Sequence, residues 1–541
     1  MSSTYKDNRI IRATAPLWRG LALLLLALST AIPASAQNGG ETLLLLMGRD
    51  TVARERVHRD ANRLEVALVS PMLGVRFEFV VELGAGGVPR RMVNRYWPAT
   101  APNAAPPQQV AVLDFIGDSV IVTIENGPTQ RIASERGAVP FINPSFALVE
   151  LALVQMAAAG RDSMTVPAFM VAGGQTMPLT LMRLGSDSVR VGIGGSESRL
   201  RVDRDQRILG GVVPAQGLRL ERVRSADVPM AAIAAPDYSA PPGAPYRALE
   251  VRIPTPMGHT LAGTLTLPDG ASPTNRVPAI VTSTGSGLQD RDEALPTVPG
   301  YRLFRQVADT LSRHGIAVLR LDDRGFGASE GNGNTATSRD FADDVQAALA
   351  WLRNRPEIDP ARLGIVGHSE GGLIAPLVAA EDTTLRAIVL LAGPSRTGRE
   401  VIRYQQRAAI ERMPGVTAAQ RDSFVVAATA SLDSIAATSA WIRFFLEYDP
   451  IPTAHRVRRT AVFIVQGATD QQITADQAPE LEAAFRAAGN RDVTMRVFPE
   501  ANHLLIQDPD GNPAGYGLLP DRAVRPDILG LVLEWVRERM R

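Results

Sequence analysis

The second half of the chain alternates short apolar runs with stretches long enough to form helices. Six such runs stand between residues 278 and 503: PAIVTS, IAVLRLDD, RLGIVGHS, RAIVLLAG, AVFIVQGATD and TMRVFPEANH. Helix-compatible segments separate most of them, and residues 302–315 and 339–354 are clear examples. Apolar strands that alternate with helices predict a mainly parallel sheet between two helix layers. In such a sheet, chemistry gathers at the carboxyl ends of the strands.

One of these runs leads directly into a serine flanked by small residues. Residues 363–372 read LGIVGHSEGG, with Ser369 at the centre, and an apolar helix-compatible segment follows. Small neighbours let a serine occupy the sharp, strained turn between a strand and a helix, with its hydroxyl exposed. This context predicts a nucleophile at Ser369 rather than an ordinary turn serine.

A serine hydroxyl needs a base to take its proton, and in this kind of fold the base comes last in the chain. The histidines are His58, His259, His314, His368, His455 and His503. Of the two that follow Ser369, His455 lies among basic residues ahead of a strand, where we expect it on the surface. His503 comes directly after the predicted strand TMRVFPE, so a loop can place it over the sheet. We therefore expect His503 to be the base.

The acid that orients this histidine should follow the strand between the serine and the base. Asp470 stands just beyond a predicted strand that ends at Gly467. Asp476 is the local competitor, but it lies farther along, in what reads as the next helix. The predicted triad is therefore Ser369, His503 and Asp470. The alternative is a decayed relative that keeps these residues without catalysis.

A triad also needs hydrogen-bond donors for the oxyanion, and losing one typically costs ~3 kcal/mol of transition-state stabilisation. The backbone N–H of Glu370, the residue after the nucleophile, is one expected donor. The other should come from residues 282–293, TSTGSGLQDRDE, whose glycines let backbone amides face a pocket. We expect Ser286 to supply it, with Gly287 as the alternative. The Asp290-Arg291-Asp292 cluster reads as an ion-paired brace for this loop.

With these residues in view, residues 249–541 resemble the α/β-hydrolase superfamily. The resemblance rests on GSGLQDRDE, DDRGFGAS, GHSEGG, GATDQQI and EANHL, and it is nearest to bacterial carboxylesterases related to the serine aminopeptidase and dienelactone hydrolase branches. It implies a three-layer α/β fold with a mostly parallel central sheet and the catalytic residues Ser369, Asp470 and His503. The oxyanion loop departs from the family pattern, because Leu288 replaces the usual proline and Thr284 a common histidine. Residues 395–458 are expected to form a helical cap.

The first half has a different pattern and carries no catalytic motif that we recognise. Residues 75–83, VRFEFVVEL, alternate apolar and mostly polar positions, as a half-buried strand does, and residues 110–127 and 198–214 read as hairpins. One helix is expected from residue 146 to residue 159, with Ser145 as its cap. We therefore expect a β-rich domain over residues 37–234, a Pro- and Ala-rich linker over 235–246, and a catalytic domain over 247–541.

The amino terminus has the order of a secretory signal. Four basic residues come first: Lys6, Arg9, Arg12 and Arg19. The apolar run Leu21 to Leu28 follows, and then Ala34-Ser35-Ala36 at cleavage distance. We expect residues 1–36 to be removed, and the alternative is an uncleaved membrane anchor. The sequence has no cysteine, which excludes disulfides and the cysteine of a lipoprotein anchor. A periplasmic or secreted protein without a membrane span is expected.

The net charge and the absence of several motifs argue against nucleic-acid binding and against a bound metal or cofactor. The formal net charge is +1, from 57 basic and 56 acidic residues, and no long basic run argues for nucleic acid as a partner. The HExxH, phosphate-binding and dinucleotide fingerprints are absent, so we expect no cofactor or metal. The leading hypothesis is an exported serine esterase that acts on a small-molecule ester. A peptidase with the same machinery is the second hypothesis, and a binding protein that works through its β-rich half is the third.

Overall fold

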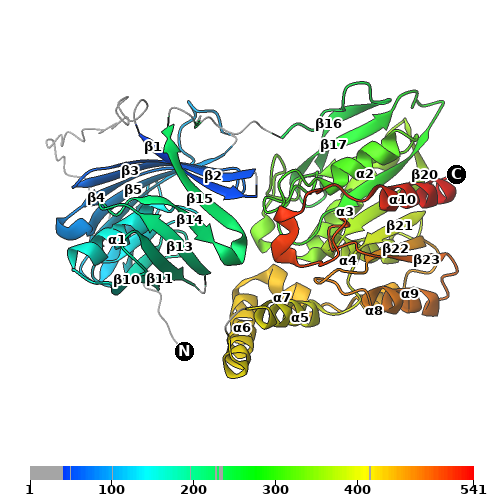
Figure 1. Ribbon diagram of the computed structural model, residues 1–541. Helices are drawn as coiled ribbons and strands as arrows, with labels where there is room; N and C mark the ends of the chain where they lie inside the picture. The colour runs from blue at the N-terminus through cyan, green and yellow to red at the C-terminus, as the bar shows by residue number, and fades with distance from the viewer. Residues whose placement is uncertain are drawn as a thin grey trace, which may run out of the picture.

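The computed structural model places the chain in two lobes, an amino-terminal one coloured blue to green and a carboxyl-terminal one coloured green to red (Figure 1). It describes residues 40–541 except 49, 100, 195, 226–227, 229, 231–235 and 414–415. The predicted secretion signal, residues 1–36, lies outside the described residues.

The amino-terminal lobe is built on one sheet of fifteen strands. Their order is β8-β7-β6-β5-β4-β3-β2-β1-β15-β14-β13-β12-β11-β10-β9. The strands are β1 Glu41–Met47, β2 Asp50–Arg59, β3 Arg63–Ser70, β4 Val75–Leu83, β5 Pro89–Pro98, β6 Gln109–Ile116, β7 Ser119–Ile124, β8 Thr129–Ala133, β9 Val139–Phe141, β10 Ser163–Met170, β11 Thr176–Arg183, β12 Ser188–Ile193, β13 Ser196–Val202, β14 Ile208–Val213 and β15 Leu218–Arg224. Neighbouring strands are antiparallel except β9 and β10, which are parallel. The predicted strand at residues 75–83 and both predicted hairpins are confirmed.

This sheet curls around a helix, α1 (Ala147–Ala158). Phe115 of β6 meets Phe169 of β10 edge to face at 6.2 Å between ring centroids, and the Ser134 and Thr176 hydroxyls are hydrogen-bonded at 2.8 Å. The two ends of the long sheet therefore approach each other. Buried side chains of the strands and of α1 form one continuous core. The helix fills the concave side of the sheet, which is why it is apolar on nearly every face.

The amino terminus of α1 is capped by a residue from a distant strand. Sequence analysis predicted Ser145 as the cap, and its hydroxyl accepts from the backbone N–H of Leu148 at 3.4 Å, although the N-cap position is Phe146, which has no side-chain cap of its own. In addition, Glu55 of β2 accepts hydrogen bonds from the backbone N–H groups of Phe146 and Ala147, at 2.9 and 3.0 Å, and from the Ser145 hydroxyl. The carboxylate satisfies helix donors that would otherwise lack partners inside the core.

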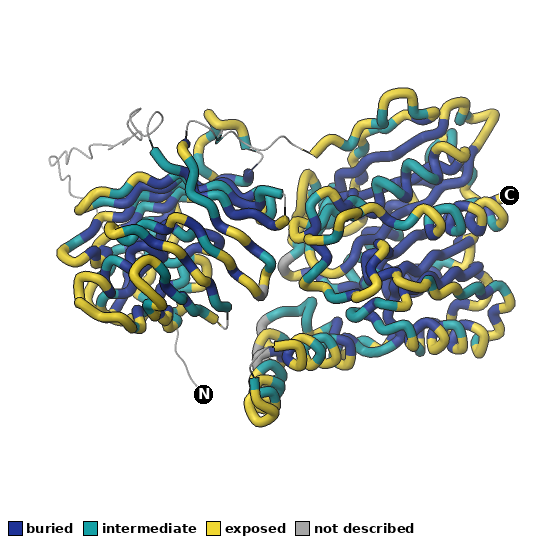
Figure 2. The backbone as a smooth tube through the Cα atoms, viewed as in Figure 1, coloured by how far each residue is buried: buried dark blue, intermediate teal, exposed yellow. Residues whose placement is uncertain are grey.

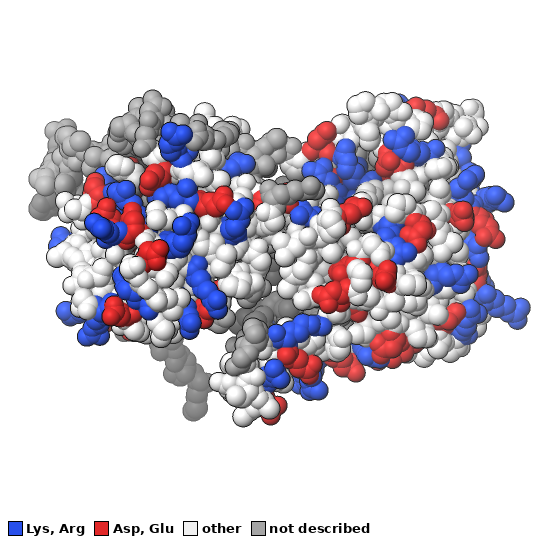
Figure 3. Space-filling view, in the orientation of Figure 1, with Lys and Arg blue, Asp and Glu red and all other residues white. Residues whose placement is uncertain are grey.

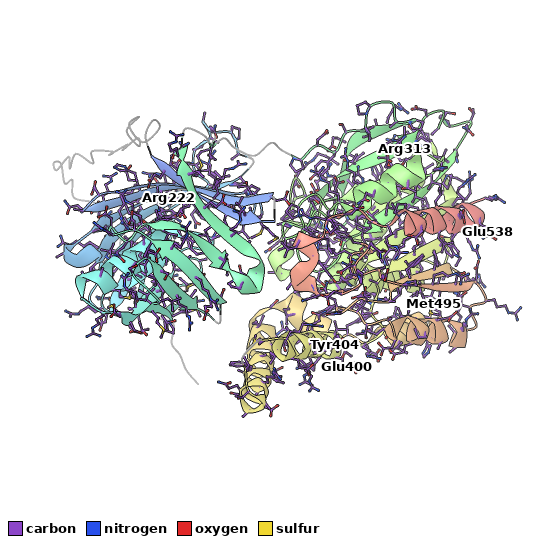
Figure 4. The ribbon with its side chains drawn as sticks, viewed as in Figure 1. Arg222, Arg313, Glu400, Tyr404, Met495 and Glu538 are labelled. Carbon is purple, nitrogen blue, oxygen red and sulfur yellow. The ribbon has the colours of Figure 1, made fainter. Side chains whose placement is uncertain are left out.

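A second buried acid ties the other side of α1 to the sheet. Glu150 accepts hydrogen bonds from Arg59 at 2.9 Å, from the backbone N–H of Ile208 at 2.8 Å and from Arg222. Arg222 is labelled in Figure 4 on the lobe that contains β15. Burial raises the pKa of Glu150, and the two arginines act against that shift. The helix is thus fixed to the sheet by polar contacts as well as by apolar packing.

Glu55 makes the stability of this domain depend on pH. Burial raises its pKa from 4.5 to about 7. The folded state therefore holds the proton more tightly than the unfolded state, so stability is lost as pH rises through this interval. At about 1.4 kcal/mol per pKa unit, we expect the contribution of Glu55 to the free energy of unfolding to fall by about 3 kcal/mol between pH 4.5 and 7.

Urea unfolding of the full chain and of Glu55→Gln at pH 5 and pH 8 measures this effect. The amide keeps an acceptor for the helix amides and carries no charge, so the variant should be the more stable protein at pH 8 and similar to the native protein at pH 5. Glu125→Gln, at an exposed position, is the control. Equal pH dependence in Glu55→Gln and the native chain would contradict the assignment.

The carboxyl-terminal lobe is built on a sheet of eight strands in the order β16-β17-β19-β18-β20-β21-β22-β23. The strands are β16 Tyr246–Pro254, β17 Thr260–Pro268, β18 Val277–Ser283, β19 Ala317–Leu321, β20 Ile358–His368, β21 Ala387–Leu391, β22 Ala461–Gly467 and β23 Val493–Phe498. The first two strands form an antiparallel hairpin, and the strands from β19 to β23 in this order pair in parallel. Figure 2 shows the central strands of this sheet in dark blue, as buried.

Helices cover both faces of this sheet. They are α2 Leu303–Ser312, α3 Ser338–Arg353, α4 Glu370–Glu381, α8 Pro450–Ala454, α9 Gln477–Ala487 and α10 Pro526–Arg539. One apolar core joins α3, α4, α8 and α9 to one face, and a second joins α2 and α10 to the other. The predicted helices within residues 302–315 and 339–354 are confirmed as α2 and α3. This arrangement gives the expected three layers, with the parallel strands ending on a common edge.

Three further helices follow β21, in the segment predicted as a cap: α5 Gly398–Glu411, α6 Ala418–Thr438 and α7 Ala440–Glu447. In Figure 1, α6 projects away from the body of the lobe. Tyr404 and Glu400, both on α5, are labelled in Figure 4. Over the described residues, no single helix is long and apolar enough to cross a membrane, and the pair α6 and α7 passes that test only together, bent by 119°.

The two lobes touch through the segment that follows the last strand. Asp50 of β2 forms an ion pair with Arg522 at 2.6 Å, and Met47 packs so closely on Gly517 that a methyl group there would stand 2.3 Å from its sulfur. Gly517 belongs to the short helix η6 (Pro513–Leu518), which lies a few residues after His503. On the face shown in Figure 3, acidic and basic residues are mixed over both lobes.

Candidate active site

Ser369 occupies a strained turn between a strand and a helix. β20 ends at His368 and α4 begins at Glu370, and Ser369 between them has φ 52° and ψ −114°. Positive φ is costly for a residue with a side chain, so the surrounding structure must hold it. The Ser369 N–H donates to the carbonyl of Leu391 at 2.8 Å, which ties the turn to the next strand.

The small residues around Ser369 are required by close backbone contacts. A methyl group on Gly371 would stand 2.0 Å from the carbonyl oxygen of Ser283, and one on Gly367 would stand 2.0 Å from that of Gly371. Both are far inside normal contact distance. Glycines therefore let α4 start directly against β18 and hold Ser369 at the carboxyl edge of the sheet.

Gly371→Ala is expected to destabilise the catalytic domain by about 3 kcal/mol, because the added methyl meets backbone atoms that cannot move independently. Gly530→Ala is the matched control, since Gly530 lies within α10 and has no atom within 4 Å of an added methyl. That control should be neutral or slightly stabilising. Thermal unfolding of both variants measures the difference, and equal melting temperatures would contradict the packing described here.

His503 and Asp470 are hydrogen-bonded to each other. His503 Nδ1 lies 2.8 Å from Asp470 Oδ2, and both side chains are buried. Asp470 follows the end of β22 and His503 follows the end of β23, so the two come from neighbouring parallel strands. Since a carboxylate only accepts hydrogen bonds, Nδ1 carries a proton, and in the neutral ring Nε2 then keeps its lone pair. This is the tautomer that a general base needs.

Asp470 is itself held by three donors. Its Oδ1 accepts from the backbone N–H groups of Gln472 and Ile473, at 2.8 and 2.9 Å. Its Oδ2 accepts from the side-chain amide of Gln466 at 2.9 Å, in addition to His503. The carboxylate is thereby fixed in orientation through both of its oxygens. Sequence analysis did not identify Gln466, which lies inside an apolar strand without any motif to mark it.

The turn at Ser369, called the elbow below, contacts His503 through the residue that precedes the serine. His368, directly before Ser369, lies with Nε2 3.0 Å from the carbonyl oxygen of His503, and the two imidazole rings are 5.0 Å apart between centroids. Within the described residues, the Ser369 hydroxyl makes no hydrogen bond to His503. In the absence of substrate, catalytic hydrogen bonds are often long and shorten only in the complex.

The two competitors considered in the sequence lie elsewhere. His455 is exposed at the carboxyl end of α8. Asp476 is exposed at the start of α9, where it pairs with Arg396. Neither is hydrogen-bonded to Ser369, His503 or Asp470 among the contacts of the described chain. The serine, acid and histidine that the structure brings to one edge are the three that the order of the chain selected.

The loop after β18 lies against Ser369, and its nearest residue is Gly285. A methyl group on Gly285 would stand 3.3 Å from Ser369 Cβ, whereas Ser286 and Gly287 are exposed farther along the loop. Sequence analysis named Ser286 and Gly287 as donors and used Gly285 only as a flexible position. Glu370 opens α4, so its backbone N–H has no partner within the helix. Donors for an oxyanion are thus available on both sides of Ser369.

Asp323 holds this loop through two hydrogen bonds. It accepts hydrogen bonds from the Thr284 hydroxyl at 2.9 Å and from the backbone N–H of Gln289 at 2.8 Å. Burial raises the pKa of Asp323 well above its usual value, and these two donors act against the shift. A small cavity of about 30 Å³ has Gly285, Asp323 and Glu370 among its lining residues.

The expected brace is present, with different partners. Arg291 forms a bidentate ion pair with Asp322, at 3.0 and 2.9 Å. Asp292 pairs with Arg320 instead of with its neighbour in sequence. All four side chains are buried, so breaking either pair would leave an uncompensated charge in the core. The brace fixes the end of the loop to β19 and to the turn that follows it.

The side chain of Glu370 connects the elbow to the cap. Its carboxylate accepts hydrogen bonds from the Ser338 hydroxyl of α3 at 2.6 Å and from the Trp441 indole of α7 at 2.9 Å. Burial raises the pKa of Glu370, and hydrogen bonds from Ser338, Trp441 and Ser286 oppose this. The carboxylate therefore links the loop after β18, helix α3 and helix α7, whereas sequence analysis assigned a role only to the backbone N–H of Glu370.

The aromatic residues of α7 pack mainly on one another. Trp441 stacks on Phe445 at 5.8 Å, and Phe444 on Tyr448 at 5.3 Å. Phe445 is buried against Gly398 at the start of α5. These contacts give the four aromatic side chains a packing role. Among the described residues, no group of three His, Asp or Glu side chains is arranged to hold a metal ion.

Comparison with known proteins agrees with this architecture. Residues 300–510 match the family model described as "Serine aminopeptidase, S33". The "Polyketide transferase grgF" of a Penicillium species is 29% identical over 118 residues, which are 22% of this chain and 37% of that protein. The "Uncharacterized protein Rv2307c" of Mycobacterium tuberculosis is 32% identical over 96 residues, or 18% of this chain and 32% of that protein.

The chain spans about a third of the length of the curated relatives that it matches. Among solved structures, the Pyrococcus furiosus esterase Pf2001 aligns with 57% of this chain and 98% of its own, at 18% identity and a TM-score of 0.39. The family match covers the strand–elbow–helix and both strand ends that carry Asp470 and His503. The carboxyl-terminal lobe of this chain therefore has the α/β-hydrolase fold, and residues 300–510 of it match that family model.

Proposed function

We propose that this protein is an exported serine hydrolase that cleaves carboxylic esters through an acyl-enzyme. The observation that carries the proposal is the Asp470–His503 hydrogen bond of 2.8 Å at the sheet edge where Ser369 occupies its strained turn. The buried Asp470–His503 hydrogen bond and the strained turn at Ser369 are the two features that are hardest to explain by folding alone.

In the proposed reaction, Ser369 Oγ attacks the ester carbonyl and His503 Nε2 takes the hydroxyl proton. The backbone amide of Glu370, with that of Ser286 or Gly287, stabilises the oxyanion, and Gly285 is the loop residue nearest to Ser369. The intermediate collapses by breaking the bond to the alcohol oxygen, which leaves with the proton from His503. Water then adds to the acyl-enzyme by the same route and releases the acid and Ser369.

Two alternatives use the same residues. Aminopeptidase activity is suggested by the description of the matching family model, and cleavage of thioesters by the relative named "Thiohydrolase aneE" of Aspergillus aculeatus, 30% identical over 102 residues. The ester is preferred because no acidic pair is visible in the sequence to anchor a substrate amino terminus. A binding protein with a vestigial triad is the third alternative, and the intact Asp470–His503 pair argues against it.

Export is proposed from the signal-like residues 1–36 and the absence of cysteine. The site of action would then be the periplasm or the medium, and the substrate a small ester. Expression of the full chain with amino-terminal sequencing of the mature protein tests this. A mature terminus near Gln37 is expected, and an intact Met1 in a membrane fraction would favour the uncleaved anchor.

The activity is tested by fluorophosphonate labelling of the mature protein, followed by peptide mapping and by a panel of aryl esters, thioesters and aminoacyl amides. Labelling at Ser369 with turnover of esters is expected. Labelling with turnover of amides alone would favour the peptidase. No labelling of folded protein would favour the binding protein, and work should then turn to the β-rich domain.

A further inference from the structure

A second histidine–carboxylate pair, His368 and Glu293, contacts the proposed catalytic residues. His368 Nδ1 is 2.5 Å from Glu293 Oε1, and His368 Nε2 is 3.0 Å from the carbonyl oxygen of His503. The two side chains are only 2% and 1% exposed. None of the roles described above requires either side chain, although His368 immediately precedes Ser369.

The partners of His368 define its protonation. A carboxylate oxygen and a backbone carbonyl oxygen are both acceptors, so each ring nitrogen must donate and the ring is an imidazolium. Burial alone lowers the pKa of His368, but the charge and hydrogen bond of Glu293 and the His503 carbonyl outweigh it, and the pKa is raised. The pair is therefore a buried ion pair, in which Glu293 stabilises the imidazolium form of His368.

Glu293 is held in an unusual conformation. Its backbone has φ 55°, a region that a residue with a side chain rarely occupies, and its Oε2 has no hydrogen-bond partner in the described part of the chain. A methyl group on Gly285 would stand 3.2 Å from Glu293 Oε1. The carboxylate thus contacts the loop residue nearest to Ser369 while it binds His368. Strain and an unsatisfied atom in one buried residue are typical of a functional constraint.

We propose that Glu293 and His368 are positioning residues for acyl transfer, which join the main chain of His503, the elbow of Ser369 and the oxyanion loop at one point. The inference rests on the proposed function. The three segments come from residues far apart in the chain, and catalysis needs their relative positions to be fixed within a fraction of an ångström. A misplacement of about 1 Å can cost about a hundredfold in rate.

The variant Glu293→Gln tests whether the charge of Glu293 is needed or only its volume. The glutamine amide is nearly the same size but neutral, so it no longer stabilises the imidazolium. A neutral His368 can donate from one nitrogen only, so if Nε2 keeps the His503 carbonyl, Nδ1 becomes an acceptor and the glutamine must turn its amide N–H toward it. The charged hydrogen bond is then replaced by a weaker neutral one. We expect kcat for an aryl ester to fall about 10- to 100-fold with KM within about twofold, because neither residue contacts the substrate. His368→Asn should give a similar loss.

The matched control is His259→Asn. His259 is half-buried and forms a third histidine–carboxylate pair of this domain, with Nε2 2.9 Å from Asp344 Oδ1, and it is not hydrogen-bonded to Ser369, His503 or Asp470 within the described residues. Its loss should lower the melting temperature by a similar amount and leave kcat within about twofold. The comparison separates a general loss of stability from a loss of position.

Nitrogen-15 NMR of the imidazole groups provides a readout that does not depend on turnover. At neutral pH both nitrogens of His368 should be protonated in the native protein, and only one in Glu293→Gln. A neutral His368 in the native protein would overturn the proposal, and so would full kcat in both Glu293→Gln and His368→Asn.

The same data distinguish this inference from the proposed function. If the native protein neither reacts with fluorophosphonate nor turns over esters, the proposed function fails. If it does both, and the two variants behave as His259→Asn does, only the positioning role fails.

Discussion

Ser369→Ala is expected to reduce kcat for an aryl ester by about 10⁶-fold, to the level left by substrate binding and the oxyanion donors. The variant keeps the turn between β20 and α4 and removes only the hydroxyl that would form the acyl-enzyme. Alanine also has to adopt φ 52°, but it replaces a residue with the same Cβ, so the strain is unchanged. Melting temperature should stay near that of the native protein. Initial rates and fluorophosphonate labelling measure the effect.

Ser423→Ala is the control for Ser369→Ala, because Ser423 is an exposed serine on α6 of the cap. It should keep full turnover and full labelling at Ser369. Retention of ester turnover in Ser369→Ala would show that hydrolysis does not pass through this serine. A folded Ser369→Ala protein that is still labelled would point to another nucleophile.

The carboxyl-terminal lobe could be predicted in some detail because its signals are local. Short buried strands, amphipathic helices and the small residues around Ser369 each have a pattern within a few positions. Chain order and strand ends then selected Asp470 and His503 over Asp476 and His455. The structure brings the selected pair within 2.8 Å and leaves the other two exposed.

The contacts that could not be predicted join residues far apart in the chain. Glu55 caps α1 across 91 residues, where sequence analysis named the adjacent Ser145. Glu293 reaches His368 across 75 positions, and Trp441 reaches Glu370 across 71. No periodicity or motif marks such pairs, since each depends on how whole elements pack. The same holds for Gly285, whose proximity to Ser369 follows from the path of a loop.

These long-range polar contacts share a physical role. Glu55, Glu150, Arg291 and Glu293 are buried groups that meet charged or backbone partners from another element. Removing one partner leaves the other unsatisfied at a cost of several kcal/mol, so the pairs favour one arrangement over near alternatives more than they add net stability. In the catalytic domain, the arrangement that they favour is the one that holds the loop after β18 against the elbow.

Asp470→Asn is expected to lower kcat by about 10⁴-fold with little change in KM. The backbone N–H groups of Gln472 and Ile473 both donate to Oδ1, so the asparagine carbonyl must take that position. The amide nitrogen then faces His503 where a carboxylate oxygen accepted its proton. Because the amide donates, His503 is driven to the tautomer with its proton on Nε2.

In that tautomer, Nε2 of His503 has no lone pair toward Ser369 and cannot take the hydroxyl proton. The amide also meets the side-chain N–H of Gln466, which now has no acceptor there. Asp476→Asn is the matched control, because Asp476 is exposed and pairs with Arg396, and its kcat should stay within about twofold. Steady-state kinetics on one aryl ester compare the two variants. Equal activity of Asp470→Asn and Asp476→Asn would mean that the Asp470–His503 pair is structural, and that Ser369 is activated by another base or not at all.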